Sequence, residues 1–124
     1  GYQGELSRTS VESLVPKWAR SITLPQFLDR LDELDDVWRR RVARAARNGT
    51  VLRYVATVTP SSIAVGLQVV PMSSPLAAIK GSDNQLVFTT SRYKANPLII
   101  TGPGAGAEVT AAGVLNDILR LAGA

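Results

Sequence analysis

The chain has 124 residues, 45% of them apolar and 19% charged, which is the size and composition of an ordinary globular domain. It contains no cysteine and no histidine, which excludes disulfides, thiolate chemistry, zinc sites built on these residues and nucleophiles paired with histidine. The net charge of +4 would suit a nucleic-acid partner, but we expect none, because the basic residues follow an acidic run inside one predicted helix and complement its dipole. We expect no membrane span, since no apolar run approaches about 20 residues, and we expect a cytoplasmic protein.

The first predicted helix follows an extended lead-in over residues 1–22. Thr23 is the candidate N-cap, and Gln26 lies three residues later, as in a capping box. Apolar residues then recur at spacings of three and four, at Phe27, Leu31, Leu34, Trp38, Val42 and Ala45. Asn48-Gly49 is a stop signal. The pattern predicts one long amphipathic helix between these limits.

Four runs rich in β-branched and aromatic residues predict strands over 51–59, 63–70, 85–91 and 97–101. The turn at 59–62 joins the first two into a hairpin. A short element over 75–80 and turn residues at 81–84 come before the third strand. The last helix is expected over 107–121. This order predicts an α+β fold over a single domain, 1–124: a mixed, largely antiparallel sheet with the long helix and the C-terminal helix packed on one face.

The stretch TGPGAGAEVT, residues 101–110, joins the last strand to the last helix. Gly102, Gly104 and Ala107 satisfy G-x-G-x-x-A, in which absent side chains let backbone N–H groups approach a phosphate at a helix N-terminus. The following strand, with an acidic residue to hold a ribose, has no room in the sequence, so the dinucleotide-binding unit is incomplete. No Lys-Ser/Thr follows the glycines, which excludes a Walker loop.

Two interpretations of this turn remain open from the pattern. It can be a tight connection, or its backbone can lie against a ligand. The second is favoured by the number of glycines, because each costs about 0.5–1 kcal/mol relative to alanine in regular structure and a simple turn needs one. Glu108 in the first helical turn would repel a phosphate, so we expect contact with a less charged part of a ligand.

The other polar residues suggest no acid–base pair. We expect Asp83 and Asn84 to form a turn, and Arg92-Tyr93-Lys94 to form a solvated loop, although that loop could bind an anion. Trp18 and Trp38 are expected to be packing residues. No residue has an evident partner for general acid or base catalysis, so we predict no catalytic residue and no metal site within the chain.

The run PLAAIKGSDNQLVFTTSRYKANPLIITGPGAGAEVTAAGVLNDILRLA, residues 75–122, resembles the C-terminal end of homoserine dehydrogenase. Its last block, GPGAGAEVTAAGVLNDILR, is the most specific part. VLRYVATV at 51–58 and VESLVPK at 11–17 resemble the form fused behind an aspartate kinase. The resemblance spans most of this chain but only a minority of the family's dehydrogenase module.

The resemblance implies an oxidoreductase that interconverts L-aspartate 4-semialdehyde and L-homoserine with NAD(P)H, in threonine and methionine biosynthesis. It places the Rossmann domain, the catalytic lysine and the acidic substrate-holding residues on polypeptide outside this sequence. Lys80 and Lys94 do not match the catalytic motif, so that role is not assigned to them. The piece is therefore expected to be inactive alone.

The resemblance also implies a site and a partner. The glycine turn closes against the nicotinamide end of NADP, or of NAD, whose main cradle lies in the absent domain. This maps cofactor binding onto Gly106 and Thr110, with Gly104 and Ala105 as neighbours. The family's sheet in this region implies a homodimer. The alternative from a different class is a non-catalytic interaction module that dimerises through its sheet.

Overall fold

The computed structural model describes Ser7 and residues 9–123. The chain divides into two compact units, Gly1–Ser73 and Ser74–Ala124, and each is described here by itself. The expected single domain over residues 1–124 stays a prediction, since two compact units can belong to one domain. Among the described residues, no helix combines the length and the apolarity needed to cross a bilayer.

The expected long helix of the first unit is divided into three pieces, which corrects the prediction of one continuous helix. These are α1 (Leu24–Leu28), the 3₁₀ turn η3 (Leu31–Leu34) and α2 (Asp35–Arg47). The start is as predicted, because the Thr23 N–H donates to Oε1 of Gln26 at 2.9 Å. The end is also confirmed, as Gly49 adopts φ 64° just after α2.

The break between α1 and η3 coincides with a cluster of side chains around Trp18. Arg30, at φ −114° and ψ 14°, leaves the helical conformation. Its guanidinium carbon lies 4.1 Å from the centre of the Trp18 ring, and its Nε donates to Oε1 of Glu33 at 2.6 Å. The hydrogen bond from Arg30 lowers the pKa of Glu33. The Trp18 and Phe27 ring centres are 6.0 Å apart, so Trp18 on η2 (Lys17–Ser21) is a packing residue, as predicted.

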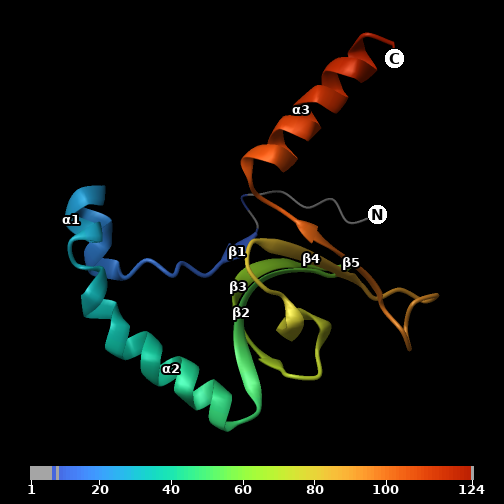
Figure 1. Ribbon diagram of the computed structural model, residues 1–124. Helices are drawn as coiled ribbons and strands as arrows, with labels where there is room; N and C mark the ends of the chain where they lie inside the picture. The colour runs from blue at the N-terminus through green and yellow to red at the C-terminus, as the bar shows by residue number, and fades with distance from the viewer. Residues whose placement is uncertain (1–6, 8, 124) are drawn as a thin grey trace. The chain divides into compact units, whose positions relative to one another are not determined.

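The first unit contains a three-stranded sheet in the order β1-β3-β2 (Figure 1). β2 (Thr50–Val58) and β3 (Ile63–Pro71) form the predicted antiparallel hairpin, with Thr50 opposite Pro71 and Val58 opposite Ile63. β1 (Ser10–Val11) pairs parallel to β3 inside the stretch expected to be a lead-in. This strand was not predicted, because it is held by contacts distant in sequence: the Leu67 N–H donates to Oε2 of Glu12 at 2.9 Å.

One face of the hairpin is apolar along its whole length. Residues that alternate along a strand share a face, and the register places the apolar pairs Leu52–Val69, Tyr54–Leu67, Ala56–Val65 and Val58–Ile63 on one side. α2 contacts β2, and Val69 nevertheless stays 64% exposed and Val58 68% exposed. A large part of this face is therefore uncovered in the chain alone.

The second unit contains β4 (Asp83–Phe88) and β5 (Leu98–Pro103), which pair antiparallel from Asp83–Pro103 to Phe88–Leu98. The short 3₁₀ element η4 (Pro75–Ala78) lies where a short element was expected, and α3 (Ala107–Leu121) has the predicted bounds. Asp83 and Asn84 are the first residues of β4, which corrects their assignment to a turn. Strand pairing overrides their turn preference because each has a partner on β5.

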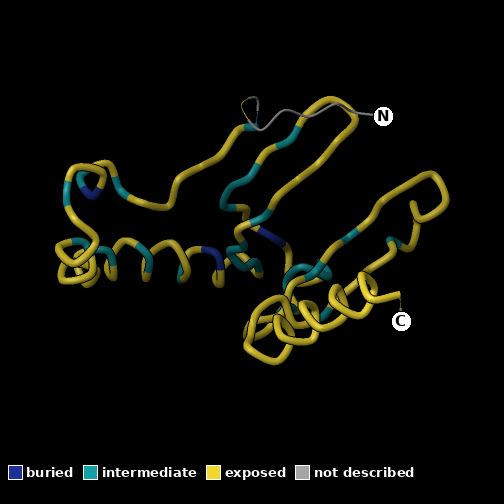
Figure 2. The backbone as a smooth tube through the Cα atoms, turned by 90° about the horizontal axis from the view of Figure 1, so that it is seen from above, coloured by how far each residue is buried: buried dark blue, intermediate teal, exposed yellow. Residues whose placement is uncertain are grey.

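The fold class is confirmed as a mixture of helices and small, largely antiparallel sheets. The described strands form two sheets rather than the one expected. Figure 2 shows how little of the described chain is buried: Ala19, Ala45 and Val70 are the buried apolar residues. The expected packing of the last helix on a sheet face is not seen among the described residues, because every residue of α3 is exposed.

Candidate cofactor-binding turn

The glycine turn lies between Pro103, the last residue of β5, and Ala107, the first of α3. The Gly104 N–H donates to the carbonyl of Ser82 at 3.3 Å, which ties the turn to the residue before β4. The Thr110 N–H donates to the carbonyl of Gly106 at 3.1 Å and opens the helix. The predicted strand–turn–helix context is therefore present.

Gly106 is the N-cap of α3 and adopts φ 132° and ψ 152°. This region of backbone conformation is accessible essentially to glycine alone. A Cβ added at Gly106 would meet no atom within 4 Å. Glycine is thus required here by the backbone, and the space beside it is open to a ligand.

The space beside Gly104 is limited by a side chain. The φ of Gly104 is not positive, so its own backbone accepts a side chain. An added Cβ would, however, overlap Nδ2 and Cγ of Asn84 and lie 2.9 Å from Oδ1 of the same side chain. The group that lies against the backbone of Gly104 is therefore the side chain of Asn84 and not a ligand. The sequence pattern did not indicate this contact.

Gly102, the third glycine, shows neither constraint. It has no positive φ, and a Cβ added to it would meet nothing within 4 Å. The three glycines that formed one motif in the sequence thus occupy three distinct environments.

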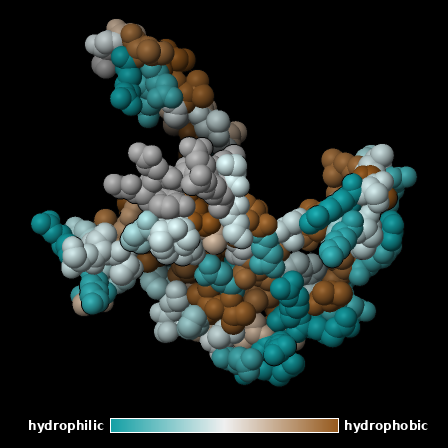
Figure 3. Space-filling model, turned by 180° about the vertical axis from the view of Figure 1, so that it is seen from behind, coloured by the Kyte–Doolittle hydropathy of each residue, from teal (hydrophilic) through white to brown (hydrophobic). Residues whose placement is uncertain are grey.

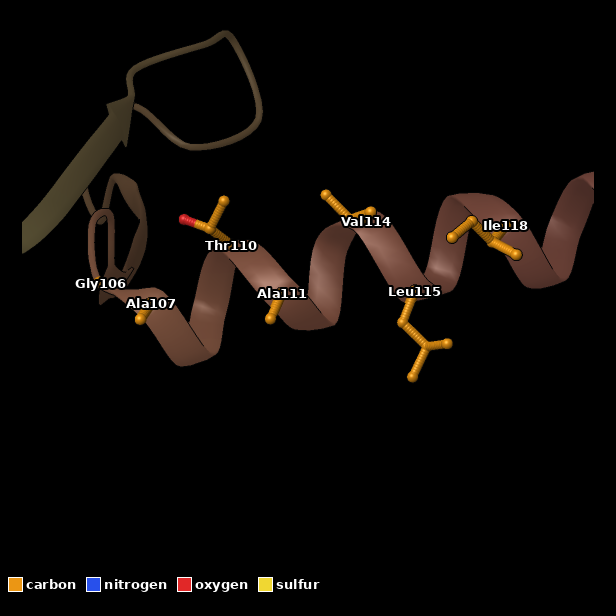
Figure 4. A pocket seen from close by; sticks show the side chains of 7 residues that line it. All are labelled: Gly106, Ala107, Thr110, Ala111, Val114, Leu115 and Ile118. Atoms are coloured by element: carbon orange, nitrogen blue, oxygen red, sulfur yellow. The ribbon is translucent and has the colours of Figure 1, made fainter.

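An open hollow of about 560 Å³ runs along α3 from the turn (Figure 4). It is lined by one helix face, at Gly106, Ala107, Thr110, Ala111, Val114, Leu115 and Ile118. Of the four predicted cofactor-binding residues, Gly106 and Thr110 line this hollow, while Gly104 and Ala105 lie in the turn beside it. Figure 3 shows the apolar side chains gathered along one side of this helix.

The hollow supplies no acid or base. None of its lining side chains is ionisable, and the Thr110 hydroxyl is the polar group among them. Glu108 lies in the first turn of α3, where it favours the helix dipole and disfavours an anion. Among the described residues, no group of three or more carboxylate, histidine or cysteine side chains could hold a metal ion. This surface suits an apolar, uncharged group, either of a ligand or of another polypeptide.

A second hollow of about 330 Å³ lies in the first unit between α2 and the hairpin. Its apolar lining consists of Ala45, Leu52, Leu67 and Val69, and Arg41 and Arg44 also line it. The sequence did not indicate this hollow, because it arises where a helix and two strands meet. Lys80 and Lys94 line neither hollow.

Comparison with known proteins gives the family. The model of the family described as homoserine dehydrogenase matches residues 1–119. The chain is 48% identical, over 94% of its length, to a bifunctional aspartokinase/homoserine dehydrogenase 1 of Zea mays, described as chloroplastic, and covers 13% of that protein. It is 41% identical over 90% of its length to the homoserine dehydrogenase of Saccharomyces cerevisiae and covers 32% of it.

A solved structure resembles this chain over most of its length. A crystal structure of a Candida auris protein, described as of unknown function, is 43% identical and superposes with a TM-score of 0.78. The match covers 92% of this chain and 32% of that one. The chain therefore spans a third or less of these relatives. It belongs to the homoserine dehydrogenase family.

Proposed function

We propose that this chain is the cofactor-facing and dimerising part of a homoserine dehydrogenase. That enzyme would interconvert L-aspartate 4-semialdehyde and L-homoserine with NADPH or NADH, in the biosynthesis of threonine and methionine. The observation that carries the proposal is Gly106, which combines a glycine-only conformation with open space at the end of an apolar hollow.

The residues of the turn fit the nicotinamide end of such a cofactor. When bound, the cofactor supplies or accepts the hydride. The chain contributes the surface: the bare backbone at Gly106 permits close approach, and the hydroxyl of Thr110 can hydrogen-bond a carboxamide. Gly104 and Ala105 shape the turn that presents this surface.

The groups that move protons and hold the substrate are proposed to lie on other polypeptide. The hollow contains no ionisable side chain, and the family's catalytic lysine motif is not matched within the chain. We therefore expect the 124-residue chain to be inactive by itself and the full-length protein to be active.

The test compares these two proteins directly. Each is assayed for NADPH oxidation in the presence of aspartate semialdehyde, and for the reverse reaction with homoserine. The expected result is turnover by the full-length protein and none by the short chain. Measurable turnover by the short chain would overturn the proposal that the catalytic groups lie on other polypeptide. Inactivity of the full-length protein would overturn the proposed reaction.

The apolar hairpin face supports a homodimer. It is continuous over four cross-strand pairs and largely exposed, and a second copy of the sheet could cover it. The same observation favours the alternative function, a non-catalytic dimerising module. The mass of the protein isolated from its source cells distinguishes the two functions. A protomer near 13.2 kDa favours the module, and a protomer several times larger favours the enzyme.

Two further features remain proposals. Fusion to an aspartate kinase is supported by the bifunctional relative from Zea mays. A cytoplasmic location is proposed from composition. The relative from Zea mays is described as chloroplastic, which is the alternative location. Intact mass and fractionation of the source cells test these two proposals.

A further inference from the structure

We infer that Asn84 is a positioning residue for the glycine turn: its carboxamide occupies the space that a side chain at residue 104 would need, and it holds the turn so that Gly106 faces the cofactor. The inference rests on the proposed function of the turn and adds a residue that lies outside the glycine motif. Asn84 reaches the turn only through the pairing of β4 with β5, in which the residue opposite it is Gly102.

The start of β4 touches the turn at two points. Gly104 lies two residues beyond Gly102, and residues two apart along an extended chain share a face. The side chain of Asn84 extends along this face to Gly104, where its Nδ2 and Cγ fill the position of an added Cβ. The second point is the backbone of Ser82, the residue before β4, because the Gly104 N–H donates to its carbonyl at 3.3 Å.

The absence of a side chain at Gly104 is explained by this contact and not by the backbone. The positive φ values of the described glycines are at Gly49, Gly81, Gly106 and Gly123, so Gly104 is outside that set. Alanine at 104 would be acceptable to the chain conformation but would collide with the carboxamide. The exposed side chain of Asn84 must then rotate away, and its contact with the turn is lost.

A movement of the turn would reach the cofactor surface directly. Gly106 follows Gly104 by two residues and begins α3, whose first turn carries Thr110. Catalysis by hydride transfer depends strongly on orientation, and a misplacement of about 1 Å can reduce the rate by about 100-fold. A side chain that fixes Gly104 therefore fixes the groups that meet the nicotinamide.

The experiment uses four variants of the full-length protein and steady-state kinetics. Gly104→Ala and Asn84→Ala are each expected to raise the KM for NADPH about threefold, because each removes the contact between the carboxamide and the turn. The double variant Asn84→Ala/Gly104→Ala should have the same KM as either single variant, since the contact can be lost only once. Gly102→Ala adds the same methyl group in open space and should change the KM much less than Gly104→Ala.

The readouts separate positioning from general stability. The KM for aspartate semialdehyde should change less than the KM for NADPH. The melting temperature should stay close to that of the wild type. An unchanged KM for NADPH in Gly104→Ala, or additive effects in the double variant, would overturn the role of Asn84 while the wild type remains active. A wild type that neither binds NADPH nor turns over would instead overturn the proposed function, and the positioning role with it.

Discussion

At the scale of single residues, the glycines of the turn have separate physical causes. Gly106 is required by its backbone, whereas Gly104 lies against the side chain of Asn84. Gly102 has neither feature. A sequence motif of small residues therefore combines positions whose substitution should have different consequences.

The first prediction concerns Gly106. Replacement by leucine in the full-length protein should force a side chain into a conformation that costs about 1–3 kcal/mol. It should also place atoms where the cofactor is proposed to lie, so we expect the NADPH affinity to fall at least tenfold. Fluorescence titration with NADPH measures this change. Unaltered affinity would remove Gly106 from the proposed site.

Gly113 offers a control for this prediction. It lies inside α3, and a Cβ added there meets nothing within 4 Å in this chain. Gly113→Ala should stabilise the helix by about 0.5–1 kcal/mol, because glycine is a poor helix former. Denaturant unfolding of the two variants should therefore give shifts of opposite sign.

At the scale of elements, a local cluster decides where the first helix breaks. Arg30 lies over Trp18 and bonds Glu33, and this arrangement occurs where the chain leaves the helical conformation. The apolar periodicity continues through the break, so periodicity alone indicated one helix. Contacts with η2 outweigh the modest propensity of these residues to continue the helix.

The second prediction tests that cluster. Arg30→Ala should expose Trp18 and shift its fluorescence to longer wavelength, measured in a Trp38→Phe background. Arg39→Ala is the matched control, because Arg39 pairs with Asp36 on the exposed surface of α2 and its ion pair involves neither Trp18 nor Glu33. Equal spectra for the two variants would contradict the role of Arg30.

The same cluster has a pH dependence with a definite sign. The pKa of Glu33 is lowered in the folded chain by the hydrogen bond from Arg30. The hydrogen bond between Arg30 and Glu33 therefore contributes fully to stability above the pKa of the unfolded carboxyl group, which is 4.5. This contribution is lost as the pH falls through the lower pKa of the folded chain. Glu33→Gln should abolish the part of the acid-induced fluorescence change that comes from Trp18. An acid transition identical in both proteins would rule out Glu33 as its origin.

The third prediction concerns the docking of β1. A Cβ added at Gly66 would lie 2.9 Å from Oε2 and 3.1 Å from Cβ of Glu12. Alanine usually suits a strand better than glycine, but here overpacking should destabilise the pairing by about 1–3 kcal/mol. Hydrogen exchange should become faster at the amides of Glu12 and Leu67, which bond across β1 and β3. Glu12→Gln keeps an acceptor oxygen and should leave the Leu67 amide protected.

At the scale of the whole molecule, the chain leaves much of its apolar surface in water. Three described apolar residues are buried, while Leu115 is 54% exposed and Ile118 is 55% exposed. Stability requires that apolar burial offset the conformational entropy of folding. This surface is therefore expected to be covered by further polypeptide or by a second copy.

The fourth prediction follows from that exposure. The isolated 124-residue chain should bind the dye ANS and should lack a single cooperative heat-absorption peak. The full-length protein should bind little dye and unfold cooperatively. Calorimetry and dye fluorescence on both proteins measure the difference. Weak dye binding and a sharp transition in the short chain would show that its apolar faces are already buried.

Local sequence was sufficient for the elements whose causes are local. The hairpin, the glycine stop after α2 and the bounds of α3 follow from β-branched runs, turn residues and helical periodicity. The capping pair Thr23–Gln26 is also within four residues of chain. For the candidate site, local reasoning placed the glycines at a strand-to-helix turn, and the family resemblance added Gly106 and Thr110, which both line the hollow.

The tertiary structure decided what depends on residues far apart in the chain. Arg30 meets Trp18 at the helix break, Glu12 binds β3 beside β1, and Asn84 meets Gly104 across the β4–β5 pair. None of these contacts leaves a periodic trace in the sequence. The sequence by itself determined the hairpin, the limits of the helices and the glycine turn, because turns, caps and periodicity act over a few residues. Only folding decided which side chain meets which backbone, because such contacts exist only once strand pairing brings distant residues together.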